Sequence, residues 1–196
     1  EDKFNLESKN IFQNSFPKII TVARLEKRKG HEKILMSIKN LKAKYPNIKY
    51  ISIGGGNEKN NLTKLCEELG LDKEVSFLEN IDNSLKIALI KNSNLFLMPT
   101  IIDSRSVEGF GISYVEAASY GVSSIGGKDG GASDAILHEK TGLICDGNDL
   151  NSIYSSIEKI IENEKYKEFG KEAEKFSKKF YWDKVIQEYI NLIKSL

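Results

Sequence analysis

Apolar residues follow two different spacings along this chain. Short runs rich in β-branched residues, the pattern of buried strands, occur at 18–23, 48–53, 75–77, 95–98, 123–125 and 142–144. Between these runs the apolar positions recur at helical spacing, as Ile34, Leu35 and Ile38 do within the expected helix 31–44. Further helices are expected at 62–69, at 83–91 and around Glu116. This alternation of strand and helix predicts a parallel sheet with helices on both faces.

The same pattern divides the chain into three parts. Residues 18–164 carry the alternation and are expected to form an α/β, Rossmann-like three-layer sandwich with a six-stranded, mainly parallel sheet. Residues 165–196 continue as amphipathic helices, with Phe169 and Trp182 on their apolar stripes, and are expected to form a helical C-terminal extension. Residues 1–17 are mostly polar and lack periodicity, so they are interpreted as a linker that enters the domain.

Composition excludes several classes of protein. Hydrophobic residues make up 40% of the chain, and no apolar run approaches the roughly 18 residues of a membrane-spanning helix. The 29 basic residues are balanced by 28 acidic residues, which argues against nucleic-acid binding through bulk charge. Cys66 and Cys145 lie far apart and outside any metal-binding spacing, and no signal peptide is recognised. A reducing, cytoplasmic setting is therefore expected.

The first candidate for chemistry is a turn between two carboxylates, Glu108-Gly-Phe-Gly-Ile-Ser-Tyr-Val-Glu116. Gly109 and Gly111 flank Phe110, which indicates a backbone that turns sharply or approaches a ligand closely. At a helix start, the unpaired amides of such a turn can face a phosphate, while carboxylates accept hydrogen bonds from sugar hydroxyls. A surface loop followed by an exposed helical glutamate is the alternative, and the paired glycines favour the functional interpretation.

Basic residues follow the first expected strand. Arg24 and Lys29 would project at the carboxyl edge of the sheet. Arginine offers a planar fork to phosphate oxygens and lysine a mobile point charge, so the pair suits a diphosphate. On these residues alone, a solvated basic loop that also contains Lys27 and Arg28 is an equally good interpretation.

Glycine-rich loops follow two later strands, at Gly54-Gly55-Gly56-Asn57 and at 126–134. Parallel sheets bind ligands beyond the carboxyl ends of their strands, so a nucleotide could lie against either loop, although each could also be an ordinary turn. Neither a Gly-x-Gly-x-x-Gly fingerprint after the first strand nor a P-loop occurs in the sequence. A dinucleotide-binding dehydrogenase and a P-loop nucleotidase are therefore not supported.

Taken in order, these segments resemble the retaining glycosyltransferases of family 4, also called group 1, and specifically the C-terminal donor-binding domain of their GT-B fold. The resemblance covers nearly the whole chain. It rests on Ala23-Arg24-Leu25, Lys29-Gly30, Ile53-Gly54-Gly55-Gly56, Leu97-Met98-Pro99, Glu108 to Glu116, Gly130-Gly131 and Thr141-Gly142-Leu143. Two departures are that Ala23 stands where the family usually has glycine, and Asp134 where glutamate often follows the glycine pair.

The resemblance implies a role for each site residue. Arg24 and Lys29 would bind the donor diphosphate, Glu108 would contact hydroxyls of the transferred sugar, and these three would be the catalytic residues. Glu116 would hold the ribose hydroxyls. The remaining donor-binding positions implied by the resemblance are Gly54, Gly55, Ile81, Gly109, Phe110, Gly111 and Ile112.

No cofactor or metal is expected. The sequence contains no Asp-x-Asp pair to hold a divalent ion. In the mechanism that the resemblance implies, charge develops on the leaving diphosphate, where Arg24, Lys29 and the helix dipole behind Phe110 would stabilise it.

The resemblance also implies the substrates. The donor would be a nucleotide-diphosphate sugar, whose base would be held mainly by main chain near 78–82, which leaves uridine, guanosine and adenosine open. A GT-B enzyme has two domains, so this chain is expected to be the donor half, inactive by itself, with an acceptor glycan or lipid-linked glycan held by a missing N-terminal domain. Bacterial polysaccharide or lipopolysaccharide assembly is the expected setting. The expected location is cytoplasmic, with peripheral binding to the inner face of the cytoplasmic membrane left open, and no nucleic-acid partner or transmembrane segment is expected.

Two other classes of function stay open at this point. One is a GT-B-fold enzyme that is not a transferase, such as a sugar-nucleotide epimerase or a phosphorylase. The other is a non-catalytic module that binds a sugar nucleotide. An epimerase would convert the nucleotide sugar without an acceptor, whereas a non-catalytic module would bind the donor and stay inactive even at full length.

Overall fold

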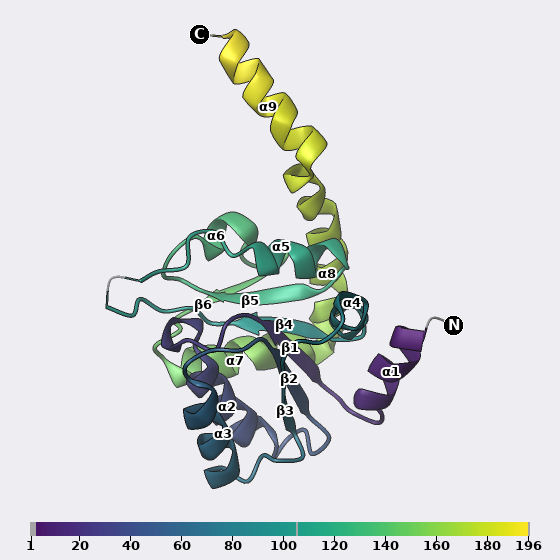
Figure 1. The fold of residues 1–196 in the computed structure, drawn as a ribbon, viewed down its shortest axis with the longest axis vertical. Helices are drawn as coiled ribbons and strands as arrows, with labels where there is room; N and C mark the ends of the chain where they lie inside the picture. Colours follow the sequence, from purple (N-terminus) through teal and green to yellow (C-terminus); the bar gives the residue numbers. More distant parts are fainter. Residues whose placement is uncertain (1–2, 105, 196) are drawn as a thin grey trace.

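The centre of the fold is a parallel sheet, seen in a computed structural model that describes residues 3–104 and 106–195 (Figure 1). Its strands are β1 (Lys18–Val22), β2 (Lys49–Ile53), β3 (Val75–Leu78), β4 (Leu95–Met98), β5 (Ser123–Gly127) and β6 (Gly142–Cys145). They stand in the order β3-β2-β1-β4-β5-β6, and every paired register is parallel. The order switches direction between β1 and β4, and such a point leaves a crevice at the carboxyl ends of the two strands.

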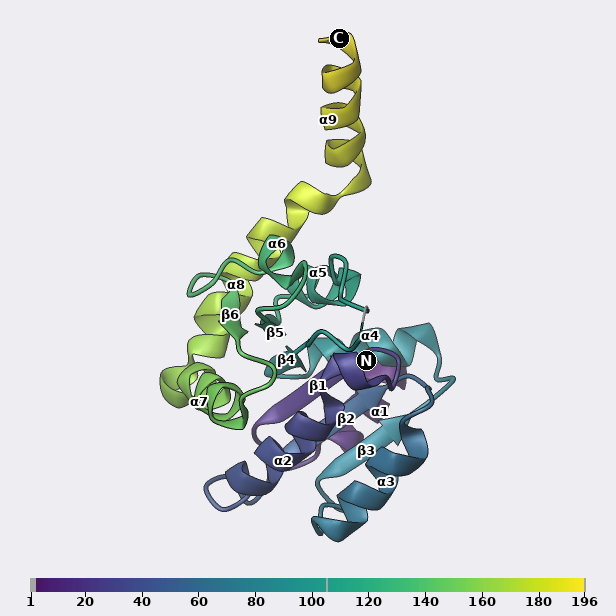
Figure 2. The same ribbon diagram turned by 90° about the vertical axis from the view of Figure 1, so that its left-hand side faces the viewer.

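Helices cover both faces of this sheet (Figures 1 and 2). One face carries α2 (His31–Leu41), α3 (Lys59–Glu68) and α7 (Leu150–Ile161). The other face carries α4 (Asn83–Lys91), α5 (Ile112–Ser119) and α6 (Ala132–Ala135). Two apolar clusters fill the space between the layers, and α8 (Lys165–Ser177) packs along α5, β5 and β6. The arrangement is a three-layer α/β sandwich.

The predicted fold class is confirmed by this architecture. Each expected strand is present, with ends that lie within two residues of the predicted ones. All four residues of β4 are buried, as a continuous apolar run in a central parallel strand requires. The predicted helix stripe is correct as well, because Ile34, Leu35 and Ile38 are all fully buried.

The N-terminal segment is more ordered than its composition indicates. Helix α1 (Lys3–Ile11) packs against α4, where the buried Ser8 hydroxyl donates to the Ala88 carbonyl oxygen at 3.0 Å. Phe12, directly after the helix, is 1% exposed. Phe4 and Ile11 pack partly buried against the same apolar cluster as α4, so the few apolar residues of this segment do have helical spacing, which the sequence prediction did not recognise. The interpretation of 1–17 as an interdomain linker stays a prediction, and its residues 1–2 lie outside the described part.

The last helix projects from the domain. After the 3₁₀ turn η3 (Lys178–Phe180), α9 (Trp182–Lys194) points away from the sheet and its helices (Figures 1 and 2). It contains no buried residue, and Trp182, Tyr189 and Ile193 are each more than half exposed. Amphipathic helices ordinarily bury such a stripe. The predicted helix is therefore present, but within the described residues its apolar face is uncovered.

Candidate functional site

The loops after β1 and β4 meet at the point where the strand order switches. Residues 23–30 leave β1 through the 3₁₀ turn η1 (Lys27–Lys29), and the Ile101 amide of the second loop donates to the Arg28 carbonyl oxygen at 2.9 Å. Gly30 has a φ of 76°, and a Cβ on it would lie 2.4 Å from the Pro99 carbonyl oxygen. Glycine at this position thus lets the two loops touch.

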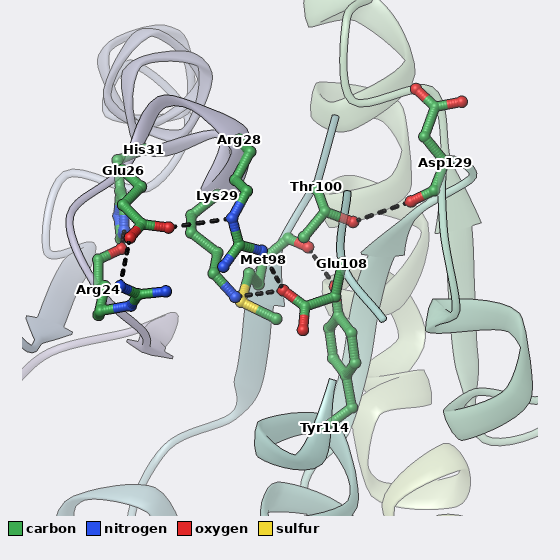
Figure 3. Close-up of polar contacts among 10 residues, drawn as sticks. All are labelled: Arg24, Glu26, Arg28, Lys29, His31, Met98, Thr100, Glu108, Tyr114 and Asp129. Carbon is green, nitrogen blue, oxygen red and sulfur yellow. Dashed lines mark hydrogen bonds and ion pairs between the residues drawn. The ribbon is translucent and has the colours of Figure 1, made fainter. Parts of the chain in front are cut away.

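A chain of alternating charges crosses this junction (Figure 3). Arg24 Nη1 lies 2.8 Å from Glu26 Oε1, and Arg28 Nε lies 3.0 Å from Glu26 Oε2. Arg28 Nη1 lies 2.9 Å from Glu108 Oε2, and the same carboxylate oxygen pairs with Lys29. We call these five residues the charge cluster. Its side chains run from 71% exposed at Arg24 to 9% exposed at Lys29, so the cluster leads from solvent into the protein.

Glu108 is held ionised by its two cations. Burial by itself raises the pKa of this carboxyl group, but the hydrogen bonds and charges of Lys29 and Arg28 outweigh burial and bring the pKa below its usual value. An ionised carboxylate can accept hydrogen bonds from hydroxyl groups, while the guanidinium and ammonium groups beside it can bind phosphate oxygens. The arrangement suits a ligand that joins an anionic part to a hydroxylated part.

The turn after Glu108 is anchored to the end of β4. Gly111 begins α5 with a φ of 80°, and a Cβ on it would lie 2.4 Å from the ring of Tyr114. The buried Tyr114 hydroxyl donates to the Met98 carbonyl oxygen at 2.5 Å (Figure 3). Close packing of the glycine on this ring therefore fixes the first turn of α5, where the positive end of the helix macrodipole lies.

Two further contacts hold the same turn from the other side. The Gly131 amide donates to the Glu108 carbonyl oxygen at 2.9 Å, and the Phe110 ring lies 5.2 Å from the Phe180 ring, centroid to centroid. Ile112 is nonetheless 77% exposed in the first turn of α5. The backbone of the turn is fixed while its outer surface stays open.

His31 is buried next to the charge cluster and contacts its backbone at Arg24. It is 2% exposed, with one ring nitrogen 3.3 Å from the Arg24 carbonyl oxygen and the other 3.2 Å from the Tyr50 hydroxyl. Burial lowers the pKa of His31 to about 4, against the opposing hydrogen bond to Arg24 and with a smaller lowering from the charge of Lys29. The ring is therefore neutral near pH 7. Because a carbonyl oxygen only accepts, the nitrogen beside Arg24 carries the proton.

Glu116 lies apart from the charge cluster. Its carboxylate pairs with Lys86 of α4 at 2.6 Å, and both side chains are about one-quarter exposed. No hydrogen bond or ion pair between described residues joins Glu116 to Arg24, Lys29 or Glu108. The structure thus places the predicted ribose-binding carboxylate in an ion pair between α4 and α5, whereas the predicted phosphate-binding cations lie in the loop after β1 and in η1.

The remaining predicted positions line the loops beside these two groups. A Cβ on Gly54, whose φ is 137°, would lie 2.2 Å from the Ala23 carbonyl oxygen, so this glycine lets the loops after β1 and β2 close on each other. Gly55 lies against the Glu79 carboxylate. Ile81, just before α4, packs partly buried against the same apolar cluster as Phe110.

A cleft of about 700 Å³ opens beside the exposed end of the charge cluster. Its lining residues are Arg24, Glu26, Lys27, Arg28, Gly56, Asn57, Glu58, Asp103, Ser104 and Ser106. Of the predicted site residues only Arg24 is among them, because Lys29 and Glu108 are held deeper by their mutual ion pair.

Three residues of this site were not predicted from the sequence. Arg28 and Glu26 looked like parts of a surface basic loop, although they join Arg24 to Glu108. The available signal was the single acidic residue of this basic segment, Glu26, which stands two positions from both Arg24 and Arg28. Lys86 had no such signal, because its partner Glu116 lies on another helix, 30 positions along the chain.

Between residues 3 and 195, with residue 105 aside, histidine, cysteine, aspartate and glutamate side chains form no group of three that could hold a metal ion. In the same part of the chain, each helix is too short or too polar to cross a bilayer.

Comparison with known proteins gives consistent similarities. The sequence model of the family described as glycosyl transferases group 1 matches residues 2–176. A GDP-mannose-dependent α-(1-6)-phosphatidylinositol monomannoside mannosyltransferase of Mycolicibacterium smegmatis is 31% identical over 143 residues, covering 72% of this chain and 37% of that protein. The chain thus spans well under half of that curated relative.

Solved structures show the same fold. HepE of Anabaena, in complex with UDP and glucose, superposes with a TM-score of 0.81 at 21% identity, over 100% of this chain and 53% of that one. The C-terminal domain of LpcC, a glycosyl transferase group 1 family protein of Francisella tularensis, gives a TM-score of 0.73 at 19% identity. The match covers 96% of this chain and 94% of that one.

Proposed function

The chain belongs to the glycosyl transferases group 1, and from that premise we propose that it is the donor-binding C-terminal domain of a retaining glycosyltransferase. Its substrate would be a nucleotide-diphosphate sugar, whose glycosyl group passes to an acceptor held by an N-terminal half outside this chain. The family and its GT-B fold are established by the matches, and the domain assignment and the stereochemistry are the proposal.

One observation carries this proposal. The charge cluster joins the loops after β1 and β4, which are the two strands between which the sheet order switches. Ligands of doubly wound sheets bind at this crevice. Three cations lie there beside an ionised Glu108, so phosphate groups and sugar hydroxyls have complementary partners within one site.

In the proposed reaction, negative charge develops on the diphosphate as the glycosyl bond breaks. Lys29 would turn from Glu108 to a phosphate oxygen, Arg24 would contact the exposed side of the diphosphate, and the amides at the start of α5 would add their dipole. Glu108, still paired with Arg28, would remain ionised and accept from sugar hydroxyls. With these fixed charges the reaction is proposed to need no metal ion.

The nucleoside would extend from the charge cluster toward α4 and α5. Glu116 would accept from the ribose hydroxyls, with Lys86 keeping its carboxylate charged and in place. Gly54, Gly55 and Ile81 would let the base and ribose approach the backbone. Among the relatives, HepE was solved with UDP and the mycobacterial enzyme uses GDP-mannose, which supports a nucleoside diphosphate without choosing its base.

A calorimetric titration tests this assignment. We expect the 196-residue chain to bind at least one of the uridine, guanosine and adenosine diphosphates. Arg24→Ala and Glu116→Ala should each weaken that binding about tenfold or more, because a hydrogen bond to a charged group contributes roughly 1.5–3 kcal/mol. Lys27→Ala is the matched control, since Lys27 lines the same cleft and forms no ion pair with another residue in the described part of the chain. If Arg24→Ala and Glu116→Ala bind as tightly as the parent chain, the assigned site is wrong.

The two ends of the chain are proposed to face the N-terminal half. The 1–17 segment, including α1, would be the linker from that half to this domain. Residues 165–196 would pack on this domain and, through α9, contact the N-terminal half. The uncovered stripe of Trp182, Tyr189 and Ile193 supports this, because its burial would stabilise a contact between the halves. Residue 196 lies outside the described part.

Hydrogen exchange tests the role of α9. In this chain alone, the α9 amides should exchange almost as fast as an unfolded peptide, since an uncovered short helix is marginally stable. In the full-length protein they should exchange about tenfold or more slowly. Amides of α2, which is packed against the sheet in both forms, serve as the control. Equally fast exchange of α9 at full length would contradict the proposed contact.

The location and acceptor follow as part of the same proposal. Nucleotide sugars would be met in the cytoplasm, and an acceptor glycan or lipid-linked glycan would be presented by the other half at the inner face of the membrane. The mycobacterial relative acts on a phosphatidylinositol mannoside, which supports an acceptor of this kind.

A further inference from the structure

Glu26 forms ion pairs with two of the cations that a diphosphate would need, Arg24 and Arg28. Its two carboxylate oxygens are divided between two guanidinium groups, with Oε1 at 2.8 Å from Arg24 and Oε2 at 3.0 Å from Arg28. The Glu26 side chain is 25% exposed and lines the cleft beside the cluster. A carboxylate that bridges two arginines in this way presents to them the same paired oxygens that a phosphate group would.

We propose that Glu26 is a resident anion that holds Arg24 and Arg28 in place of a donor phosphate and is displaced when the donor binds. The proposal rests on the proposed function, because it assumes that the charge cluster is the diphosphate site. The proposal concerns the affinity of that site for the donor. Glu26 would lower this affinity, a role that no other residue of the cluster is given.

The charges of the cluster predict that Glu26 lowers the affinity of the site for a diphosphate. Arg24, Arg28 and Lys29 are opposed by Glu26 and Glu108, so the cluster carries a net formal charge of +1. A diphosphate brings at least two negative charges, so it must separate Glu26 from both guanidinium groups and then lie near its carboxylate. Both effects lower the affinity of the site for the diphosphate.

Glu108 does not oppose the donor in the same way. Its partners Arg28 and Lys29 are 13% and 9% exposed, so it lies at the inner end of the cluster, away from the cleft that Glu26 lines. Glu26 alone among the acidic residues of the cluster reaches the exposed Arg24. The two carboxylates of the cluster therefore differ in role, one facing the sugar and the other occupying the phosphate position.

Glu26→Gln tests this directly, because glutamine keeps the size of the side chain and removes its charge. The probes are inorganic pyrophosphate and the uridine, guanosine and adenosine diphosphates, titrated calorimetrically into the 196-residue chain. We expect Glu26→Gln to bind pyrophosphate, and any nucleoside diphosphate that the parent binds, about 3- to 10-fold more tightly. A purely structural role for Glu26 in placing Arg24 would instead weaken binding.

Glu58→Gln is the matched control. Glu58 lines the same cleft, but its recorded side-chain contact is with Asn61, at 3.2 Å, and not with an arginine. It should change affinity by less than about twofold, which is the effect of removing one nearby charge in solvent. An equal gain in both variants would overturn the specific role of Glu26.

The outcomes separate this inference from the proposed function. If the parent chain binds a nucleoside diphosphate and Glu26→Gln binds it no better or less well, the inference fails and the proposed site stands. If neither the parent nor Glu26→Gln binds any of the four probes, both fail. Binding that appears only in Glu26→Gln supports both, because the Glu26 carboxylate then accounts for the weak binding of the probes by the parent chain.

Discussion

Gly111→Ala should destabilise the fold by about 2 to 4 kcal/mol and weaken nucleoside diphosphate binding with it. The alanine would have to keep the φ of 80° that Gly111 has, and residues other than glycine adopt this angle at a cost of roughly 1 kcal/mol or more. It would also lie 2.4 Å from the Tyr114 ring, whose displacement adds roughly 1–3 kcal/mol. The Tyr114 hydroxyl would then leave the Met98 carbonyl oxygen. Urea denaturation measures the loss of stability.

Gly109→Ala is the control within the same turn. Its Cβ would have no neighbour within 4 Å, and its φ lies outside the range that strains other residues. We expect a change within about 0.5 kcal/mol in the free energy of unfolding. If the two variants lose the same stability, the close packing of Gly111 on Tyr114 is not what holds the turn.

Acidification should destabilise the chain through His31 by about 3 kcal/mol. The pKa of His31 is about 4 in the folded state and close to 6.5 when unfolded, so between these values the unfolded chain binds a proton that the folded chain does not. The stability is fully present above pH 6.5 and is lost as the pH falls to about 4. The measurement is the free energy of unfolding at a series of pH values across this window.

His31→Asn isolates this effect from the carboxyl groups that titrate nearby. The variant is expected to be less stable at pH 7, because two buried contacts change, but its stability should fall less steeply between pH 6.5 and 4 than that of the parent. Parallel slopes for His31→Asn and the parent would show that His31 does not cause the acid sensitivity.

Strands and apolar stripes could be predicted because they report burial, which follows directly from spacing. The order of the strands was not predicted, and it is this order that brings the loops after β1 and β4 together, where Lys29 pairs with Glu108. The assignment of these residues to a donor remains a prediction.

Other features could not be predicted because they depend on partners distant in sequence. The Glu116–Lys86 pair joins two helices, and the bridge from Arg24 through Glu26 to Arg28 depends on how one 3₁₀ turn folds. Helix α1 was not predicted, although Phe4, Ile11 and the following Phe12 have helical spacing and pack in the apolar cluster that includes α4. The Glu116–Lys86 pair and the bridge through Glu26 depend on tertiary geometry that sequence spacing alone does not specify.

The ring of Phe180 resting on Phe110 has a mechanical meaning. Phe180 belongs to η3, the short turn from which α9 departs, and Phe110 sits in the turn between Glu108 and α5. Because aromatic rings in contact resist overlap, a tilt of α9 about η3 is expected to press the Phe180 ring against the Phe110 ring. The base of α9 and the turn that carries Phe110 are thus joined by a direct aromatic contact.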